Sequence, residues 1–210
     1  ILDYVKTFGS DNTTVLGTVG WSRDTRDSAI YPTTGGTQRA SLESGLPGGT
    51  LRFYKLGYQN QRYYPLTRDL TFYVNGDIGY ANGLDGLPLP FFRNYYAGGV
   101  SSVRGFATAT IGPKDTNGDP VGGSKKFVSN VELLFPFPGL RNDRSMRVST
   151  FVDAGIIGES YDFGELRMSA GIGWLWLSPF GPFKISYAKA IRTEPGDRTE
   201  RFQFTFGSQF

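Results

Sequence analysis

The sequence predicts an all-β fold, a transmembrane antiparallel up-and-down β-barrel to which the chain contributes about eight or nine strands. The first observation is the final segment, 201–210, where apolar and polar residues alternate and an aromatic residue comes last. Such a strand turns one face to lipid and the other to water. The second is composition: aromatic residues make up 15% of the 210 residues and glycines number 29, yet hydrophobic residues reach only 39%. The third is that no window approaches the ~18–20 uninterrupted apolar residues of a membrane-spanning helix.

Nine segments show this alternation, and turn-forming residues separate them. Each is about long enough to cross a bilayer when tilted. In chain order they are residues 14–24, 37–46, 51–64, 70–81, 125–135, 146–157, 166–178, 182–190 and 201–210. The fourth shows the pattern most fully, with Phe72 and Val74 on one face and Thr71 and Asn75 on the other.

The seventh segment, 166–178, helps to decide which face meets lipid. Trp174 and Trp176 lie on the face opposite Arg167. Alternation alone would also suit a soluble sandwich with its polar face outward. Tryptophan near strand ends favours a membrane, because amphipathic rings collect where hydrocarbon meets headgroups.

The connections between strands predict which end faces the periplasm, since outer-membrane barrels have short periplasmic turns and longer extracellular loops. Counting back from a periplasmic carboxy terminus places the short turns 64–69 and 178–182 in the periplasm. The predicted extracellular loops are 82–124, 158–165 and 191–200. Two connections depart from the rule: 46–50 is short yet extracellular, and 25–36 is long yet periplasmic.

Charge and composition argue against several classes of function. The formal net charge is +3 and the Lys and Arg residues are scattered, so no nucleic-acid partner is expected. Histidine is absent, which removes Ser-His catalysis and histidine metal ligation. Asp115–Asp119 resembles the start of a calcium loop, but Lys126 stands where an EF-hand needs its closing Glu. We therefore expect no enzymatic activity, no cofactor and no metal site.

One domain is predicted over residues 1–210, with more barrel upstream. Nine is an odd number of strands, whereas bacterial single-chain barrels have an even number. Residues 1–13 contain Tyr4 and Phe8 but no full strand, and Ile1 is not an initiator Met. We expect a mature chain or a part of a longer one.

The connection 82–124, a loop of about forty residues, is unusual inside a compact domain and points to function. It contains Val103-Arg104-Gly105-Phe106, which resembles the [VI]RG[FY] signature of the BamA-type outer-membrane assembly factors and of their relatives in two-partner secretion. Other segments match the family in the same order: Phe91 to Gly99, Val131 to Pro136, Phe151 to Gly155, Leu177 to Pro182 and Arg201 to Phe204. The chain is similar to the family from about residue 14 to residue 210.

The resemblance implies the carboxy-terminal part of a sixteen-stranded barrel in the outer membrane of a Gram-negative bacterium. It implies an insertase that assembles nascent outer-membrane β-barrel proteins and inserts them without nucleotide or cofactor. The other implied partners are outer-membrane lipid and accessory assembly lipoproteins, which bind through POTRA domains absent from these residues. It also implies a lateral seam between the first and last strands of the barrel, of which 201–210 supplies the last-strand side.

By resemblance, the motif pins loop 82–124 to the inside of the barrel wall, and strand parity independently supplies partners for Arg104. With Val131 and Leu133 on the lipid face, Glu132 points inward. Asp153 points inward by the same rule, and a planar guanidinium suits two carboxylates. The alternative is that both are ordinary solvated charges. A wet lumen would screen the cluster, so loss of Arg104 should cost near ~1 kcal/mol.

The last strand carries a second set of candidate residues. Phe202, Phe204, Phe206 and Phe210 would share the lipid face, and they resemble the carboxy-terminal signal by which assembly machinery recognises barrels. Gly207 would interrupt the strand at a lumen-facing position, where glycine permits a bend. By resemblance it marks a kink near the seam; an ordinary glycine of a glycine-rich barrel is the alternative.

Three functions remain: an insertase, a two-partner secretion translocator that exports a client through the lumen, and a passive porin. A porin needs an open lumen and has no use for an inward arginine lock. For the segment on its own, an open sheet edge in lipid is costly. We therefore expect it to close as a small barrel between a strand in 14–46 and 201–210, squeezing loop 82–124 partly or wholly out of the lumen.

Overall fold

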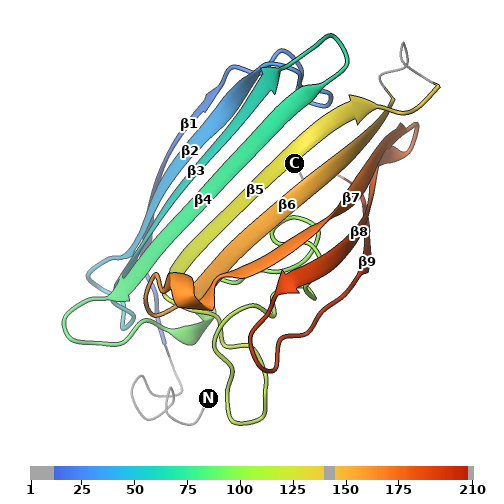
Figure 1. Ribbon diagram of the computed structural model, residues 1–210. Helices are drawn as coiled ribbons and strands as arrows, with labels where there is room; N and C mark the ends of the chain where they lie inside the picture. The colour runs from blue at the N-terminus through green and yellow to red at the C-terminus, as the bar shows by residue number, and fades with distance from the viewer. Residues whose placement is uncertain (1–11, 140–144, 208–210) are drawn as a thin grey trace.

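The computed structural model describes residues 12–139 and 145–207, which form one antiparallel sheet of nine strands (Figure 1). In chain order the strands are β1 (Leu16–Asp24), β2 (Gly35–Gly45), β3 (Phe53–Pro65), β4 (Thr71–Gly83), β5 (Lys125–Pro136), β6 (Met146–Gly158), β7 (Arg167–Ser178), β8 (Gly181–Arg192) and β9 (Phe202–Phe206). Short 3-10 turns, η1 (Phe91–Arg93) and η2 (Phe163–Glu165), lie in two connections. Among these residues no helix has the length and hydropathy to cross a bilayer. Each strand pairs with the next along the chain, so the predicted all-β, up-and-down fold is confirmed.

The strand boundaries follow the prediction to within a residue or two, except at the last strand. β9 spans five residues and ends at Phe206, well short of the predicted segment 201–210. Gly207 follows with a φ of +100°, and its N–H donates to Pro182 O (3.0 Å). Residues with side chains rarely adopt such a φ, so the glycine bends the chain where a bend was predicted. Phe210 lies outside the described residues.

The outer face of the sheet is apolar and the inner face is polar. Large apolar side chains are exposed along the outer face: Val19, Trp21, Leu56, Ile78, Val131, Val152, Ile172, Tyr187 and Phe204. Polar side chains are buried on the inner face: Asn75, Asn130, Ser149, Asp153, Ser169 and Gln203. Soluble proteins show the reverse arrangement. The strands therefore present their apolar face to lipid, which settles the question that alternation alone left open.

The sheet is open, which contradicts the expected closure into a small barrel. β1 and β9 form its two edges, and no pairing joins them within the described residues. The cause is the connection between β4 and β5, residues 84–124, which packs against the concave face instead of leaving it (Figure 1). A closed barrel of about eight strands has room only for its own inward side chains. The packed loop thus keeps the sheet wide.

The long connection between β1 and β2, residues 25–34, is an ordered turn. The carboxylate of Asp27 accepts hydrogen bonds from Thr33 N–H (2.8 Å), Thr33 Oγ1 (2.5 Å) and Thr34 N–H (3.1 Å). The additional residues of this connection therefore form a turn that is closed by hydrogen bonds to Asp27.

This turn reaches across the concave face to β6. Arg147 of β6 donates from Nη1 to Pro32 O (2.6 Å), and its guanidinium lies 4.2 Å from the centre of the Tyr31 ring. Because the strands are antiparallel, the turn lies at the end of the sheet opposite loop 84–124. A cavity of about 540 Å³ separates the two, lined by Pro32 and Arg147 on one side and by Ser102 and Arg104 on the other.

Candidate functional site

Loop 84–124 lies on the inner face as a folded unit (Figure 1). Isolated β-bridges join Tyr95 to Gly123 and Ala97 to Ile111. Side chains of the loop and of the inner face form one buried hydrophobic cluster: Ala81, Tyr95, Ala97, Val103, Phe106, Ile111, Val128 and Ile157. The inner face, expected to be polar in an alternating barrel, is therefore mixed where the loop covers it. Ala81, Val128 and Ile157 supply an apolar part of the wall, and polar side chains of neighbouring strands supply the rest.

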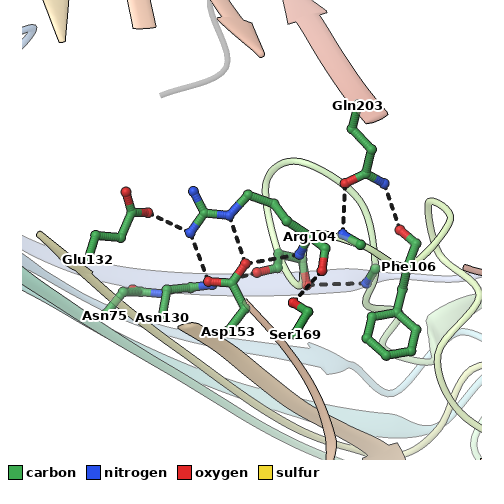
Figure 2. Close-up of polar contacts among 11 residues, drawn as sticks. Asn75, Arg104, Phe106, Asn130, Glu132, Asp153, Ser169 and Gln203 are labelled. Atoms are coloured by element: carbon green, nitrogen blue, oxygen red, sulfur yellow. Dashed lines mark hydrogen bonds and ion pairs between the residues drawn. The ribbon is translucent and has the colours of Figure 1, made fainter. Parts of the chain in front are cut away.

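Arg104 extends from this loop to both predicted carboxylates (Figure 2). Its Nε donates to Asp153 Oδ2 (2.7 Å), and its Nη2 donates to Asp153 Oδ1 (2.8 Å) and Glu132 Oε1 (2.7 Å). The backbone N–H of Arg104 also donates to Asp153 Oδ2 (3.0 Å). The guanidinium lies 3.4 Å from the centre of the Phe151 ring, in position for a cation–π contact. The predicted contacts are present, with Glu132 on β5 and Asp153 on β6.

In this cluster, which we call the lock (Arg104, Glu132 and Asp153), Arg104 and Asp153 are buried and Glu132 is partly exposed. Arg104 is 8% exposed and Asp153 is 0% exposed. Burial alone would lower the pKa of Arg104, but the negative charges of Glu132 and Asp153, and hydrogen bonds to both, raise it above its ordinary value. Removing one partner of a buried ion pair costs about 3–5 kcal/mol. The expected ~1 kcal/mol assumed solvent screening, which the burial of Arg104 and Asp153 reduces, so we expect the larger loss.

A row of inward polar side chains on neighbouring strands supports the lock. Strand register places four of them side by side on β4 to β7: Asn75, Asn130, Asp153 and Ser169. Asn75 Nδ2 donates to Asn130 Oδ1 (2.8 Å), and Asn130 Nδ2 donates to Ser102 O of the loop (2.6 Å). Ser169 Oγ donates to Arg104 O. Sequence reasoning missed Asn75, Asn130 and Ser169: parity marks them as inward, but the path of the loop decides which inward residues meet it.

The other residues of the predicted motif pack closely without carrying charge. Val103 and Phe106 are both 0% exposed within the hydrophobic cluster. Gly105 has a φ of +85°, and a Cβ added there would lie 3.1 Å from Ala188 Cβ and 3.3 Å from Ser169 Cβ. Only a residue without a side chain combines this conformation with such an approach to β7 and β8.

At the last strand, the predicted lipid-facing residues Phe202, Phe204 and Phe206 are each more than half exposed on the outer face. On the opposite face Gln203 is 4% exposed and meets the motif (Figure 2). Its Oε1 accepts the N–H of Gly105 (3.1 Å), and its Nε2 donates to Phe106 O (2.7 Å). The sequence showed Gln203 only as one of several inward polar residues.

The arrangement is suited to holding a loop in place. Asp115, which begins the segment resembling a calcium loop, closes a turn instead: its Oδ1 accepts the N–H groups of Asn117 and Asp119 (2.9 Å each). Over residues 12–139 and 145–207, no cluster of three or more His, Cys, Asp or Glu side chains is placed to hold a metal. The lock and Gln203 instead fix one backbone segment against the inner wall.

The sequence and the fold are each similar to known proteins of one superfamily. The Omp85 superfamily domain matches residues 4–210. The chain is 38% identical to the outer membrane protein assembly factor BamA of Neisseria meningitidis serogroup B over 246 aligned residues. This alignment covers 100% of the chain and 31% of that protein. It is 29% identical to the factor of the same name from Nitratidesulfovibrio vulgaris, over 98% of the chain and 27% of that protein.

More distant relatives and a solved structure agree. The sorting and assembly machinery component 50 homolog of Mus musculus is 28% identical over 89% of the chain and 44% of its own length. The crystal structure of BamA from Haemophilus ducreyi lacking POTRA domains 1-3 matches with a TM-score of 0.84 and 31% identity, over 89% of the chain and 41% of that structure. The chain thus spans less than half the length of these relatives.

Proposed function

Because the chain belongs to the Omp85 superfamily, we propose that it forms the carboxy-terminal part of the barrel of an insertase that assembles β-barrel proteins in the outer membrane. The observation that carries this proposal is the fixed loop, held by Arg104 to β5 and β6 and by Gln203 to β9. A passive porin would need the lumen that this loop occupies. A two-partner secretion translocator shares the motif, but the relatives above are named as assembly factors.

The protein is an outer-membrane β-barrel protein of a Gram-negative bacterium, in keeping with the apolar outer face of its sheet and its bacterial relatives. In the proposed mechanism, the first strand of the barrel opens from the last strand, and the opened edge offers unpaired backbone groups to an incoming strand. Unpaired groups in hydrocarbon cost several kcal/mol each, so pairing is strongly driven. Among the described residues five pairs join β9 to β8, whereas the other strand pairs have nine to thirteen, so β9 suits such a seam.

The proposed clients are nascent outer-membrane β-barrel proteins, and the surrounding outer-membrane lipid is the medium into which they are inserted. Strand pairing makes and breaks no covalent bond, so we propose a non-enzymatic function without nucleotide or cofactor. Accessory lipoproteins would bind through POTRA domains of the full-length protein, which these 210 residues do not contain.

The test is reconstitution of the full-length protein into proteoliposomes. A urea-denatured client barrel is added, and its folding is followed as a heat-resistant band on a gel. We expect faster folding than in empty liposomes or in liposomes holding an equal mass of a porin. Equal rates in all three would contradict the insertase. Transfer of an unfolded client into the vesicle interior would instead support a secretion translocator, and high conductance with the loop intact would support a porin.

A further inference from the structure

The last strand is joined to its neighbour over a short distance only. Pairing with β8 runs from Phe202 to Phe206, and one more hydrogen bond joins Ala188 N–H to Arg201 O (2.8 Å). On the outer face the ring centroids of Phe204 and Phe206 lie 6.4 Å from that of Phe183 of β8, and both side chains are otherwise exposed. The sheet alone therefore holds this strand weakly.

The residues just before β9 turn from the sheet toward the motif. Ala107 N–H donates to Arg198 O (2.8 Å), and Glu200 N–H donates to Gly105 O (3.0 Å). Phe106 and Thr199 form an antiparallel bridge between them. The motif thus serves as an additional strand for the segment that leads into β9.

Gln203 completes this attachment from within β9. Its amide group accepts from Gly105 N–H and donates to Phe106 O, so one side chain satisfies backbone groups of two consecutive residues (Figure 2). Because it is 4% exposed, water is poorly placed to replace either bond. Thr205, the next inward residue of β9, is more exposed and makes no hydrogen bond to the loop in the described structure.

The same four-residue motif is therefore held at two places. Arg104 attaches it to β5 and β6 in the middle of the sheet, and Gln203 attaches it to the strand at the edge. We propose that Gln203 is a positioning residue that couples the loop to the seam, so that release of the loop and release of β9 are one equilibrium. Such coupling is reciprocal: loosening either attachment must loosen the other by the same factor.

The functional meaning of this coupling rests on the proposed insertase. There, the motif would hold β9 in place until a client strand reaches the seam, so a permanently loosened motif would leave no ordered seam for the client and would impair assembly. The coupling itself does not depend on that function, and it is measured without any client.

The experiment weakens one attachment by substitution and measures hydrogen exchange at the other. Hydrogen exchange with mass spectrometry is measured on the full-length protein in lipid nanodiscs, for Gln203→Ala and for Arg104→Ala. Gln203→Ala should raise the exchange rate of amides in 99–107 about tenfold, as expected for loss of buried hydrogen bonds. Arg104→Ala should raise the exchange rate in 198–207 by a similar factor, although the Arg104 side chain has no hydrogen bond or ion pair to these residues in the described structure.

Two further variants make the result specific. Thr205→Ala alters the same face of the same strand and should leave exchange in 99–107 unchanged. Gln203→Glu keeps an acceptor for Gly105 N–H but sets oxygen against Phe106 O and Glu200, so it should act like the alanine variant. Should Gln203→Ala fail to insert, Gln203→Asn replaces it, because the shorter side chain reaches only one partner.

Three outcomes would overturn the coupling: Arg104→Ala accelerates exchange in the loop alone, Gln203→Ala accelerates it in β9 alone, or Thr205→Ala matches Gln203→Ala. Heat-resistant migration on a gel confirms that each variant is folded before it is compared. A coupled response in a protein that fails to fold clients would refute the insertase and leave the coupling standing.

Discussion

Arg104 combines properties that no other side chain offers in this position. Its planar fork bonds both oxygens of Asp153 and reaches Glu132, while its face lies on Phe151. A lysine ammonium would supply charge but neither the fork nor the stacked face. The site therefore depends on geometry as well as on charge.

Replacing Arg104 tests that dependence. Arg104→Ala should lower the free energy of unfolding of the full-length protein by about 3–5 kcal/mol, because Asp153 is left buried without its counter-charge. Arg104→Lys keeps a positive charge and should lose less. Urea unfolding in detergent, followed by heat-resistant migration, measures both.

The matched control is Arg198→Ala in the same loop system. The ion pair of Arg198 with Asp119 is 3.6 Å long and exposed on both sides, so its loss should cost less than ~1 kcal/mol. If Arg104→Ala and Arg198→Ala prove equally stable, the lock is not a buried ion pair.

Parity identified Glu132 and Asp153 because the direction of a side chain on a strand is a local property with period two. Burial of the lock was not predictable in this way. It depends on a hydrophobic cluster in which Val103 and Phe106 of the loop meet Val128 and Ile157 of the wall. Which distant residues meet is set by the path of the loop, and no local pattern encodes that path.

Among the single elements, the turn 25–34 likewise makes contacts that no local sequence pattern predicts. Its unusual length was visible in the sequence, but its contact with Arg147 joins residues 115 positions apart. Arg147 is buried, and both its hydrogen bond to Pro32 O and its place over Tyr31 fix the turn against β6. The turn thus covers the inner face from the end opposite loop 84–124.

Arg147→Met keeps an extended apolar side chain but removes the hydrogen bond and the cation. The turn should then detach, and protease cleavage within 25–34 should become about tenfold faster, since cleavage of a folded segment follows its opening equilibrium. Limited proteolysis of the full-length protein in nanodiscs measures this. Arg68→Met, in the exposed turn between β3 and β4, is the control and should leave cleavage in 25–34 unchanged. Equal cleavage of Arg147→Met and the unmodified protein would show that Arg147 does not hold the turn.

The turn should also loosen in acid. Burial raises the pKa of Asp27, but hydrogen bonds from Thr33 and Thr34 outweigh it and lower that pKa below the ordinary value of 3.8. A lowered pKa means that the stabilisation is complete above about pH 4 and is lost as pH falls through the lowered value. After correction for intrinsic rates, exchange of the Thr33 and Thr34 amides should be constant from about pH 7 to 5 and rise only below about pH 4. In Asp27→Asn the acid-dependent rise should disappear; its persistence would assign the effect to another group.

At the scale of the whole molecule, the nine strands and their order were predictable because each follows from local alternation and from turn residues. The open sheet was not. The expectation of closure weighed the unpaired backbone groups at β1 and β9 and left out loop 84–124. That loop brings its own hydrophobic cluster and the lock to the concave face, and both require a wide sheet.

In the proposed insertase, a loop locked to the inner wall is needed for assembly of client barrels. The most direct measurement is the client folding rate in proteoliposomes that hold equal amounts of folded full-length protein, either unmodified, Arg104→Ala or Arg198→Ala. We predict a client folding rate at least about tenfold lower for Arg104→Ala, equivalent to roughly 1.4 kcal/mol in the folding barrier. For Arg198→Ala we predict an unchanged rate. An Arg104→Ala protein that folds clients as fast as the unmodified protein would contradict this role of the loop.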